Sequence, residues 1–226
     1  MVSYIESLNH HETTLAGLFQ EQLVGISHLG RDSFTTVLLE KRVLSRAFVP
    51  LYRTVACQVE NKRLRDVVEE IIADEYRPDD HQKLLDEDLR MMGLYVPDAQ
   101  YTAKSITLST VLKASLNFYK RGPQSDLQNG FFLRVYGELL PGIEYDVLWP
   151  RLVCDFGLTP DTSQFYWHHK VHDEKRVELG VGGETHTDKF SQALAGLVHN
   201  RFDFHAAKQA IDTAYLLRSN FWKQFF

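Results

Sequence analysis

Histidines and carboxylates gather in one short stretch of the chain. The segment FYWHHKVHDEKR, at positions 165–176, holds a dense group of the ten histidines. In a helix, residues lie about 100° apart, so His169, His172 and Asp173 share one face and His168 shares a side with His172. Imidazole and carboxylate groups on one face form a metal-binding pattern. A solvated polar face, with histidines packed on aromatic rings, is the competing interpretation.

A second group of candidate ligands flanks a proline. In an unbroken helix Glu75 and His81 would lie about 120° apart, whereas Asp74 would face the same way as His81. Pro78 removes a backbone hydrogen bond and kinks a helix, which can bring Glu75 and His81 to one site. Asp74 and Glu75 therefore stay alternatives for the acidic ligand. An acidic surface stretch is the competing interpretation.

A third candidate ligand is Glu138, in the mostly apolar segment FFLRVYGELLPG at positions 131–142. A buried carboxylate is costly unless it meets a metal or a cation, and Arg134, four residues earlier, is the alternative partner. Glutamate, aspartate and imidazole together suit iron or manganese, and helical bundles hold two irons with such groups. The ferritin-type Glu-x-x-His pair is absent from the sequence.

These candidate ligands stand on predicted helices. Between Ser33 and Val59, apolar residues recur at three- and four-residue steps, the period of an amphipathic helix. Comparable patterns predict helices over residues 3–28, 63–92, 99–119, 125–140, 145–156, 162–179, 187–198 and 204–225. Glycine and proline near positions 122, 141, 157 and 180–183 are expected to end them. The prediction is an all-α bundle of about eight or nine helices.

The bulk properties limit the possible functions. With 226 residues the chain fits a single domain over 1–226, and a net charge of -5 gives no attraction for nucleic acid. The stretch from Met1 to Leu15 lacks the features of a signal peptide, and no apolar run would span a bilayer, so a cytoplasmic protein without a membrane partner is expected. Cys57 and Cys154 have apolar neighbours and are expected to be buried thiols.

The order of these segments resembles that of the haem-oxygenase-like di-iron oxidases, which keep the haem oxygenase bundle and bind two irons in place of haem. The matching stretches run from Val67 to Leu179. The resemblance implies two Fe(II) ions, O2 as co-substrate, and five ligands matched by position: Glu75, His81, Glu138, His169 and Asp173. Where the family has its last histidine, this chain has Arg176, which cannot ligate a metal. His172, one turn earlier, is the predicted substitute.

The resemblance also implies an oxidoreductase that acts on a small amino-acid-like molecule, with Glu138 and His172 as catalytic residues. The short chain and its HHxxHD segment are similar to a branch of the family that converts a brominated tryptophan to an indole-3-carbonitrile in natural-product biosynthesis. In that case Arg77 or Arg176 would bind the substrate carboxylate, and Tyr136 would line an indole-sized pocket. Helix-surface pairing with a neighbouring acid is the competing interpretation for each arginine, and core packing is that for the aromatic ring. A homodimer and an external electron donor are further expectations.

Other functions remain open at this point. An N-oxygenase or a fatty-acid decarboxylase of the same family would need the same metal ligands. A metal-free, thiaminase-like hydrolase would need Cys57 or Cys154 as its nucleophile. A haem oxygenase would need an early proximal histidine, namely His10, His11 or His28. The remaining histidines are assigned to the surface or the core: His186, His199 and His205.

Overall fold

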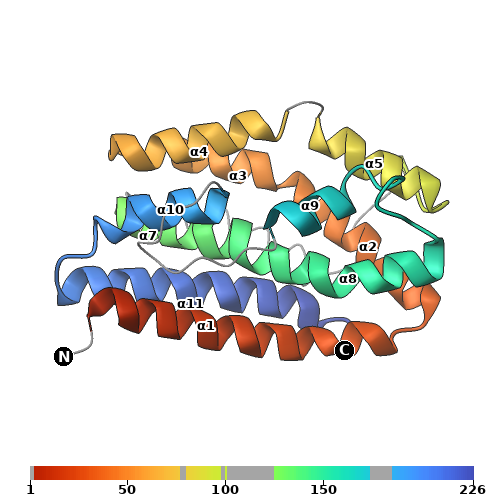
Figure 1. Cartoon of the computed structure of the whole chain (residues 1–226), viewed down its shortest axis with the longest axis horizontal. Helices are drawn as coiled ribbons and strands as arrows, with labels where there is room; N and C mark the ends of the chain where they lie inside the picture. The colour runs from red at the N-terminus through yellow and green to blue at the C-terminus, as the bar shows by residue number, and fades with distance from the viewer. Residues whose placement is uncertain (1–2, 77–79, 98–99, 101–124, 174–184) are drawn as a thin grey trace.

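The computed structural model describes residues 3–76, 80–97, 100, 125–173 and 185–226, and for positions 172 and 173 it describes the backbone alone. All regular structure in these residues is helical, and no strand occurs among them (Figure 1). The predicted all-α class is confirmed. The helix expected over 99–119 lies almost wholly outside the described residues.

In the first half of the bundle, two stretches that the sequence predicts as single helices are each divided into two helices. The elements of this half are α1 (Tyr4–Leu23), a 3₁₀ turn η1 (Val24–His28), α2 (Arg31–Arg46), α3 (Phe48–Ala56), α4 (Lys62–Asp74) and α5 (His81–Met91). Pro78 lies in the interval between α4 and α5, whereas the sequence predicts a kink there within one helix. The break at Ala47 precedes Pro50, which lacks the N–H that a continuous helix would need there but fits the first turn of a new helix.

In the second half of the bundle, a helix continues past a position where the sequence predicts its end. The elements of this half are α7 (Asp126–Leu133), a π-helical turn η2 (Arg134–Leu139), α8 (Leu140–Phe156), α9 (Tyr166–Asp173), α10 (His186–Ala195) and α11 (Arg201–Lys223). Pro141 was expected to stop the helix, but the chain continues from η2 into α8. The wider π turn accommodates a proline without an N–H, and Arg218 Nε donates to the carbonyl of Tyr136 at 2.9 Å. Gly157, with φ 70°, ends α8 as predicted.

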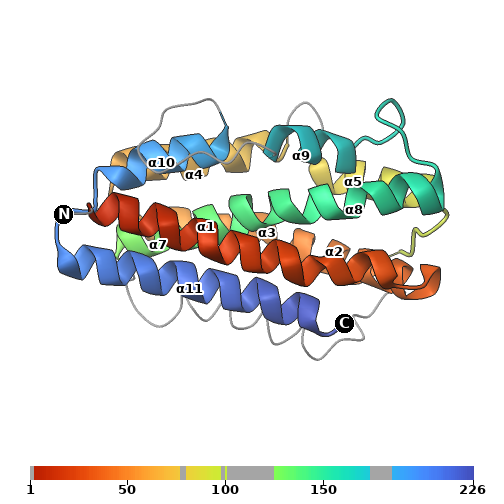
Figure 2. The ribbon, with the colours of Figure 1, turned by 60° about the horizontal axis from the view of Figure 1, so that its bottom comes forward.

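The helices form a layered bundle around a central rod. The rod is the continuous α7, η2 and α8, with α3 and α4 packed together on one side and α1 and α11 paired on the other (Figure 1). Figure 2 shows α10 beside α4, and α9 running along α8. Buried Phe131, Phe132 and Trp222 are among the largest core side chains. Segments far apart in sequence therefore face one another across the middle of the rod.

Two surface features complete the description. Cys57 and Cys154 are both exposed, which corrects the expectation of buried thiols. Their neighbours in sequence point about 100° away around the helix, so apolar neighbours do not predict burial. In the described part of the chain, no helix combines the length and the apolar character needed to cross a bilayer.

Candidate metal centre

A cavity of about 190 Å³ opens between the central rod and the helices around it. Four of the predicted metal ligands line it: Glu75, His81, Glu138 and His169. Other titratable residues that line it come from several helices: Lys41, Asp74, Tyr136, Tyr145, His168, His186 and Arg218. The cavity is therefore where the bundle collects its titratable side chains.

At one end of the cavity, Glu75, His81 and His169 offer ligand atoms that all lie within 4.8 Å of one another. The carboxylate Oε1 of Glu75 lies 3.4 Å from Nδ1 of His81. The backbone N–H of His81 also donates to the carbonyl of Glu75 at 3.0 Å, which joins the end of α4 to the start of α5. Of the two acids left open by the sequence, Glu75 lies in this group. One carboxylate and two imidazoles at such distances fit a single divalent metal ion.

The third member of this group, His169, is held as a neutral ligand. Its Nδ1 lies 2.8 Å from the carbonyl of Phe165, so Nδ1 carries the proton and the lone pair of Nε2 is available to a metal. Burial lowers the pKa of His169 well below its usual value, and the nearby His81 and Lys41 lower it further. The imidazole is therefore in the protonation state that metal binding requires.

The helix that carries His169 is anchored by a buried carboxylate, Asp88 of α5. Asp88 accepts hydrogen bonds from the hydroxyl of Ser163 at 2.7 Å and from the backbone N–H groups of Gln164, Phe165 and Tyr166 at 2.6, 3.1 and 3.0 Å. A carboxylate at this position satisfies the free N–H groups of the first turn and complements the helix dipole. Because α5 also carries His81, one helix positions two of the three ligands.

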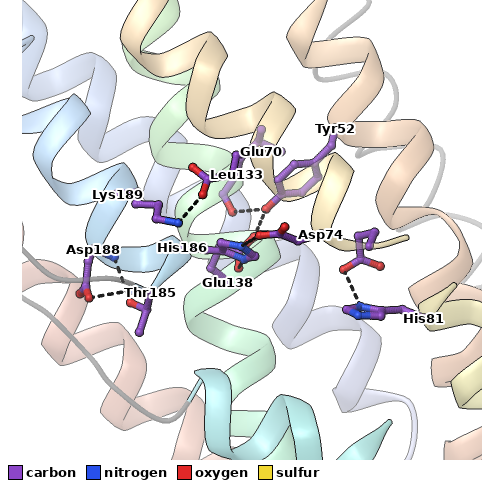
Figure 3. Close-up of polar contacts among 11 residues, drawn as sticks. Tyr52, Glu70, Asp74, His81, Leu133, Glu138, Thr185, His186, Asp188 and Lys189 are labelled. Atoms are coloured by element: carbon purple, nitrogen blue, oxygen red, sulfur yellow. Dashed lines mark hydrogen bonds and ion pairs between the residues drawn. The ribbon is translucent and has the colours of Figure 1, made fainter. Parts of the chain in front are cut away.

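At the other end of the cavity, four side chains form a connected chain (Figure 3). The hydroxyl of Tyr52 makes a short hydrogen bond to Oε1 of Glu138, and Oε2 of Glu138 lies 3.5 Å from Nδ1 of His186. Nε2 of His186 lies 3.0 Å from Oδ2 of Asp74. The sequence assigns His186 to the surface or the core, whereas the structure places it in the lining of the cavity. No spacing links it to the predicted ligands, because it begins a separate helix.

The structure also corrects or leaves aside other predicted site residues. Glu138 contacts Tyr52 and His186, whereas the alternative partner Arg134 pairs with Glu12 of α1. Tyr136 lines the cavity, as expected. The remaining predicted residues lie outside the part of the chain with described side chains: Arg77, His172, Asp173 and Arg176.

A pair of buried cations forms a further wall of the cavity. Lys41 Nζ donates to Glu144 at 2.7 Å, and Arg218 Nη1 lies 3.2 Å from both oxygens of the same carboxylate. Trp222 Nε1 also donates to Glu144 at 2.7 Å. Burial alone would raise the pKa of Glu144, but Arg218 and Lys41 outweigh it and hold the pKa below its usual value. Two cations share one carboxylate, so this group has an excess of positive charge.

Comparison with known proteins extends this description at the level of the fold. No protein-family model matches the chain, and no curated protein sequence matches it significantly. Among solved structures, a domain of unknown function from Shewanella denitrificans with a heme oxygenase-like fold superposes with a TM-score of 0.67 at 12% identity, over 98% of this chain and 88% of that one. This chain has a haem-oxygenase-like fold.

Two structures of a CADD-like protein of unknown function from Nostoc punctiforme share the haem-oxygenase-like fold of this chain. One superposes with a TM-score of 0.71 at 14% identity, over 96% of this chain and 97% of that one. The other gives a TM-score of 0.69 at 13% identity, over 96% and 94% of the two chains. At such identities the similarity is one of fold, and the chemistry must be argued from the cavity itself.

Proposed function

We propose that this chain is a non-haem di-iron oxidoreductase that uses O2 to oxidise a small amino-acid-like molecule. The observation that carries the proposal is the convergence of Glu75, His81 and His169 on one point of a buried cavity, with Glu138 at the opposite end. A donor set of imidazole and carboxylate groups suits Fe(II) better than a metal that prefers thiolate ligands. When bound, the iron pair would supply the electrons and the open coordination positions for dioxygen chemistry.

The protein itself has three tasks in this proposal. The carbonyl of Phe165 and the carboxylate of Asp88 hold His169 in position, and Tyr52 orients the carboxylate of Glu138. Phe48 and Leu51 line the cavity and exclude water from it. These contacts preorganise part of the site, because His169 and Glu138 each have a supporting hydrogen bond and His81 stands in the first turn of α5.

The cationic wall supports a substrate with a carboxylate. Lys41 and Arg218 both line the cavity, and with Glu144 they form a group with a net positive charge. Lys41 lines the same cavity as the proposed metal ligands, and its charge contributes to the lowered pKa of His169. A substrate carboxylate between this ammonium and a metal ion would interact favourably with both. In this proposal Lys41 and Arg218 take the role that the sequence gives to Arg77 or Arg176.

The finer proposal is the conversion of a brominated tryptophan to an indole-3-carbonitrile. Aromatic rings on several sides of the cavity support an indole-sized substrate: Phe48, Tyr136, Tyr145 and Phe165. An N-oxygenase or a fatty-acid decarboxylase would use the same metal ligands, so the choice rests on the substrate. An external electron donor and a homodimer remain part of the proposal.

The metal-free alternatives receive less support. A thiaminase-like hydrolase needs a cysteine nucleophile at its active site, but Cys57 and Cys154 are exposed and are not among the lining residues of the cavity. The lining residues also do not include the candidate haem ligands His10, His11 and His28. Both alternatives would require a site elsewhere in the molecule.

The test is metal binding followed by reaction with O2. The chain is reconstituted with Fe(II) without oxygen, and iron per chain is measured for the wild type, Glu75→Ala, His169→Ala and the exposed control His199→Ala. We expect two irons in the wild type and the control, and fewer in the two ligand variants. Mixing with O2 should then give a transient visible absorbance that depends on tryptophan more than on tryptamine, which lacks the carboxylate. No bound iron, or equal binding in all variants, would overturn the proposal.

A further inference from the structure

His186 lies between two carboxylates at the second end of the cavity, and its two ring nitrogens face different partners. Nε2 lies 3.0 Å from Oδ2 of Asp74, a hydrogen-bond distance. Nδ1 lies 3.5 Å from Oε2 of Glu138. The side chains of His186 and Glu138 are 14% and 6% exposed, whereas that of Asp74 is 41% exposed. The Glu138 side of the imidazole is therefore the one that faces the interior.

The position of His186 is fixed by the start of α10. Thr185 caps the helix in a reciprocal pair with Asp188, in which Thr185 N donates to Asp188 at 3.0 Å and Asp188 N donates to the Thr185 hydroxyl at 3.2 Å (Figure 3). Lys189 pairs with Glu70 at 2.5 Å and ties α10 to α4, the helix that ends at Asp74. Asp74 stands at the end of α4 and His186 at the start of α10, so both residues of this contact are held by packed helices.

The carboxylate of Glu138 is also held in one orientation. Its Oε1 accepts a hydrogen bond from Tyr52, which leaves Oε2 directed at His186. Gly137 makes this possible, because a Cβ at that position would lie 2.9 Å from Cε2 of the Tyr52 ring. The π-helical turn that carries Glu138 is a common feature of functional sites in helices.

The two contacts of the imidazole differ in a way that points to a metal. The 3.0 Å contact with Asp74 fits an Nε2–H that donates to this carboxylate, which leaves Nδ1 on the side of Glu138. The imidazole Nδ1 and the carboxylate Oε2 are then placed to bind one cation between them. With metal–ligand bonds of about 2.0 to 2.2 Å, two ligands of one ion lie roughly 3 to 3.5 Å apart. The 3.5 Å contact of His186 and the 3.4 Å contact of His81 both match this separation.

We propose that His186 is a ligand of the second metal ion, which it binds through Nδ1 together with Glu138, while Asp74 accepts the Nε2–H and fixes the tautomer. The inference rests on the proposed two-metal function and adds a ligand to it. A carboxylate behind a metal-binding histidine is a common supporting arrangement. The related family has its last histidine where this chain has Arg176, and the sequence predicts His172 as the substitute. In this proposal His186 takes that place instead of His172.

The test titrates the full-length chain with Fe(II) alone, without oxygen, and in parallel with Mn(II) followed by electron paramagnetic resonance. His186→Ala should bind one ion in place of two, and the spectrum of a coupled Mn(II) pair should become that of an isolated ion. His186→Gln, which can still donate to Asp74, should show the same loss. Asp74→Asn should keep both ions but weaken the second by roughly 10- to 100-fold. Added imidazole should restore the second ion to His186→Ala.

The controls separate this inference from the proposed function. His199→Ala removes an exposed histidine and should bind both ions as the wild type does. His81→Ala should lose the ion at the first end and keep the one at the second. If the wild type binds two ions and both His186 variants do so with unchanged affinity, His186 is no ligand but the two-metal function stands. If the folded wild type binds fewer than two ions, both the function and this inference fail.

Discussion

At one end of the cavity two of the three candidate ligands are neighbours along the chain, whereas at the other end Glu138 and His186 are brought together by packing between distant helices alone. One backbone hydrogen bond joins Glu75 and His81, and Asp88 of α5, the helix that carries His81, anchors the start of the helix that bears His169. At the other end, Glu138 and His186 come from separate elements and meet only because α10 packs against the central rod. The first end should therefore tolerate changes in core packing that the second does not.

The largest expected effect comes from removing the negative charge of Glu144, the buried partner of Lys41 and Arg218. Glu144→Gln keeps the shape of the side chain but leaves Lys41 and Arg218 buried without their counter-charge. Breaking a buried ion pair from one side costs about 3 to 5 kcal/mol, so the free energy of unfolding in urea at pH 7 should fall by that amount. The second end should also lose iron, because Arg218 donates to the carbonyl of Tyr136 in the turn that carries Glu138.

The same carboxylate predicts a pH dependence. The pKa of Glu144 is held below its usual value of about 4.5, so its stabilising effect is fully present above about pH 4.5 and is lost as the pH falls through the folded-state pKa. Glu144→Gln should lack this part of the acid sensitivity. Asp212→Asn, which alters a more exposed ion pair, is the matched control and should change stability by about 1 kcal/mol or less. Equal effects of the two substitutions would contradict the buried role of Glu144.

The next effect should damage the first end selectively. Asp88→Ala leaves the hydroxyl of Ser163 and three backbone N–H groups without their acceptor. Loss of a helix cap together with buried unsatisfied donors should lower the free energy of unfolding by about 2 to 4 kcal/mol. Iron binding should fall by the ion that His169 ligates, and Asp88→Asn, which keeps an oxygen acceptor, should lose less. If both ions leave together, the two ends are not independent.

A smaller effect should damage the second end selectively. Gly137→Ala places a methyl group against the ring of Tyr52 and displaces its hydroxyl from Glu138, at a cost of about 1 to 3 kcal/mol. Tyr52→Phe removes the hydroxyl alone, so both variants should weaken the second ion while the first stays bound. Gly17→Ala is the control, because a Cβ there meets nothing within 4 Å. Retention of both ions in Gly137→Ala would show that the orientation of Glu138 is unimportant.

The sequence predicts most of the fold because helix periodicity and proline act locally. The sequence predicts a kink at Pro78, and this proline lies between α4 and α5, because a proline removes a helical hydrogen bond and its ring clashes with the preceding turn. The break before Pro50 was missed because the apolar period continues across it. The end expected at Pro141 was wrong because Arg218, from the last helix, satisfies the carbonyl of Tyr136. That contact is tertiary, and no local pattern encodes it.

The candidate site divides in the same way. Glu75, His81 and Glu138 stand out in the sequence because they interrupt apolar patterns or flank a proline. His186 does not, because a histidine after a helix-capping threonine is as common on a surface as in a site. Lys41 and Arg218 were also missed, since single cations on amphipathic helices usually lie in water. Their burial is a property of the assembled bundle.

The smallest expected effect should leave both ends intact and change only the substrate. Lys41→Met removes one cation but leaves Glu144 paired with Arg218, so both iron ions should remain bound. A hydrogen bond to a charged group contributes about 1.5 to 3 kcal/mol, so KM for an amino-acid substrate should rise about tenfold or more. Lys41→Arg, which keeps the charge, should lose less, and tryptamine, which lacks a carboxylate, should be insensitive to both changes. An equal loss for tryptamine would mean that Lys41 supports metal binding and not the substrate carboxylate. The cationic wall and the two ends of the cavity would then not have separate roles.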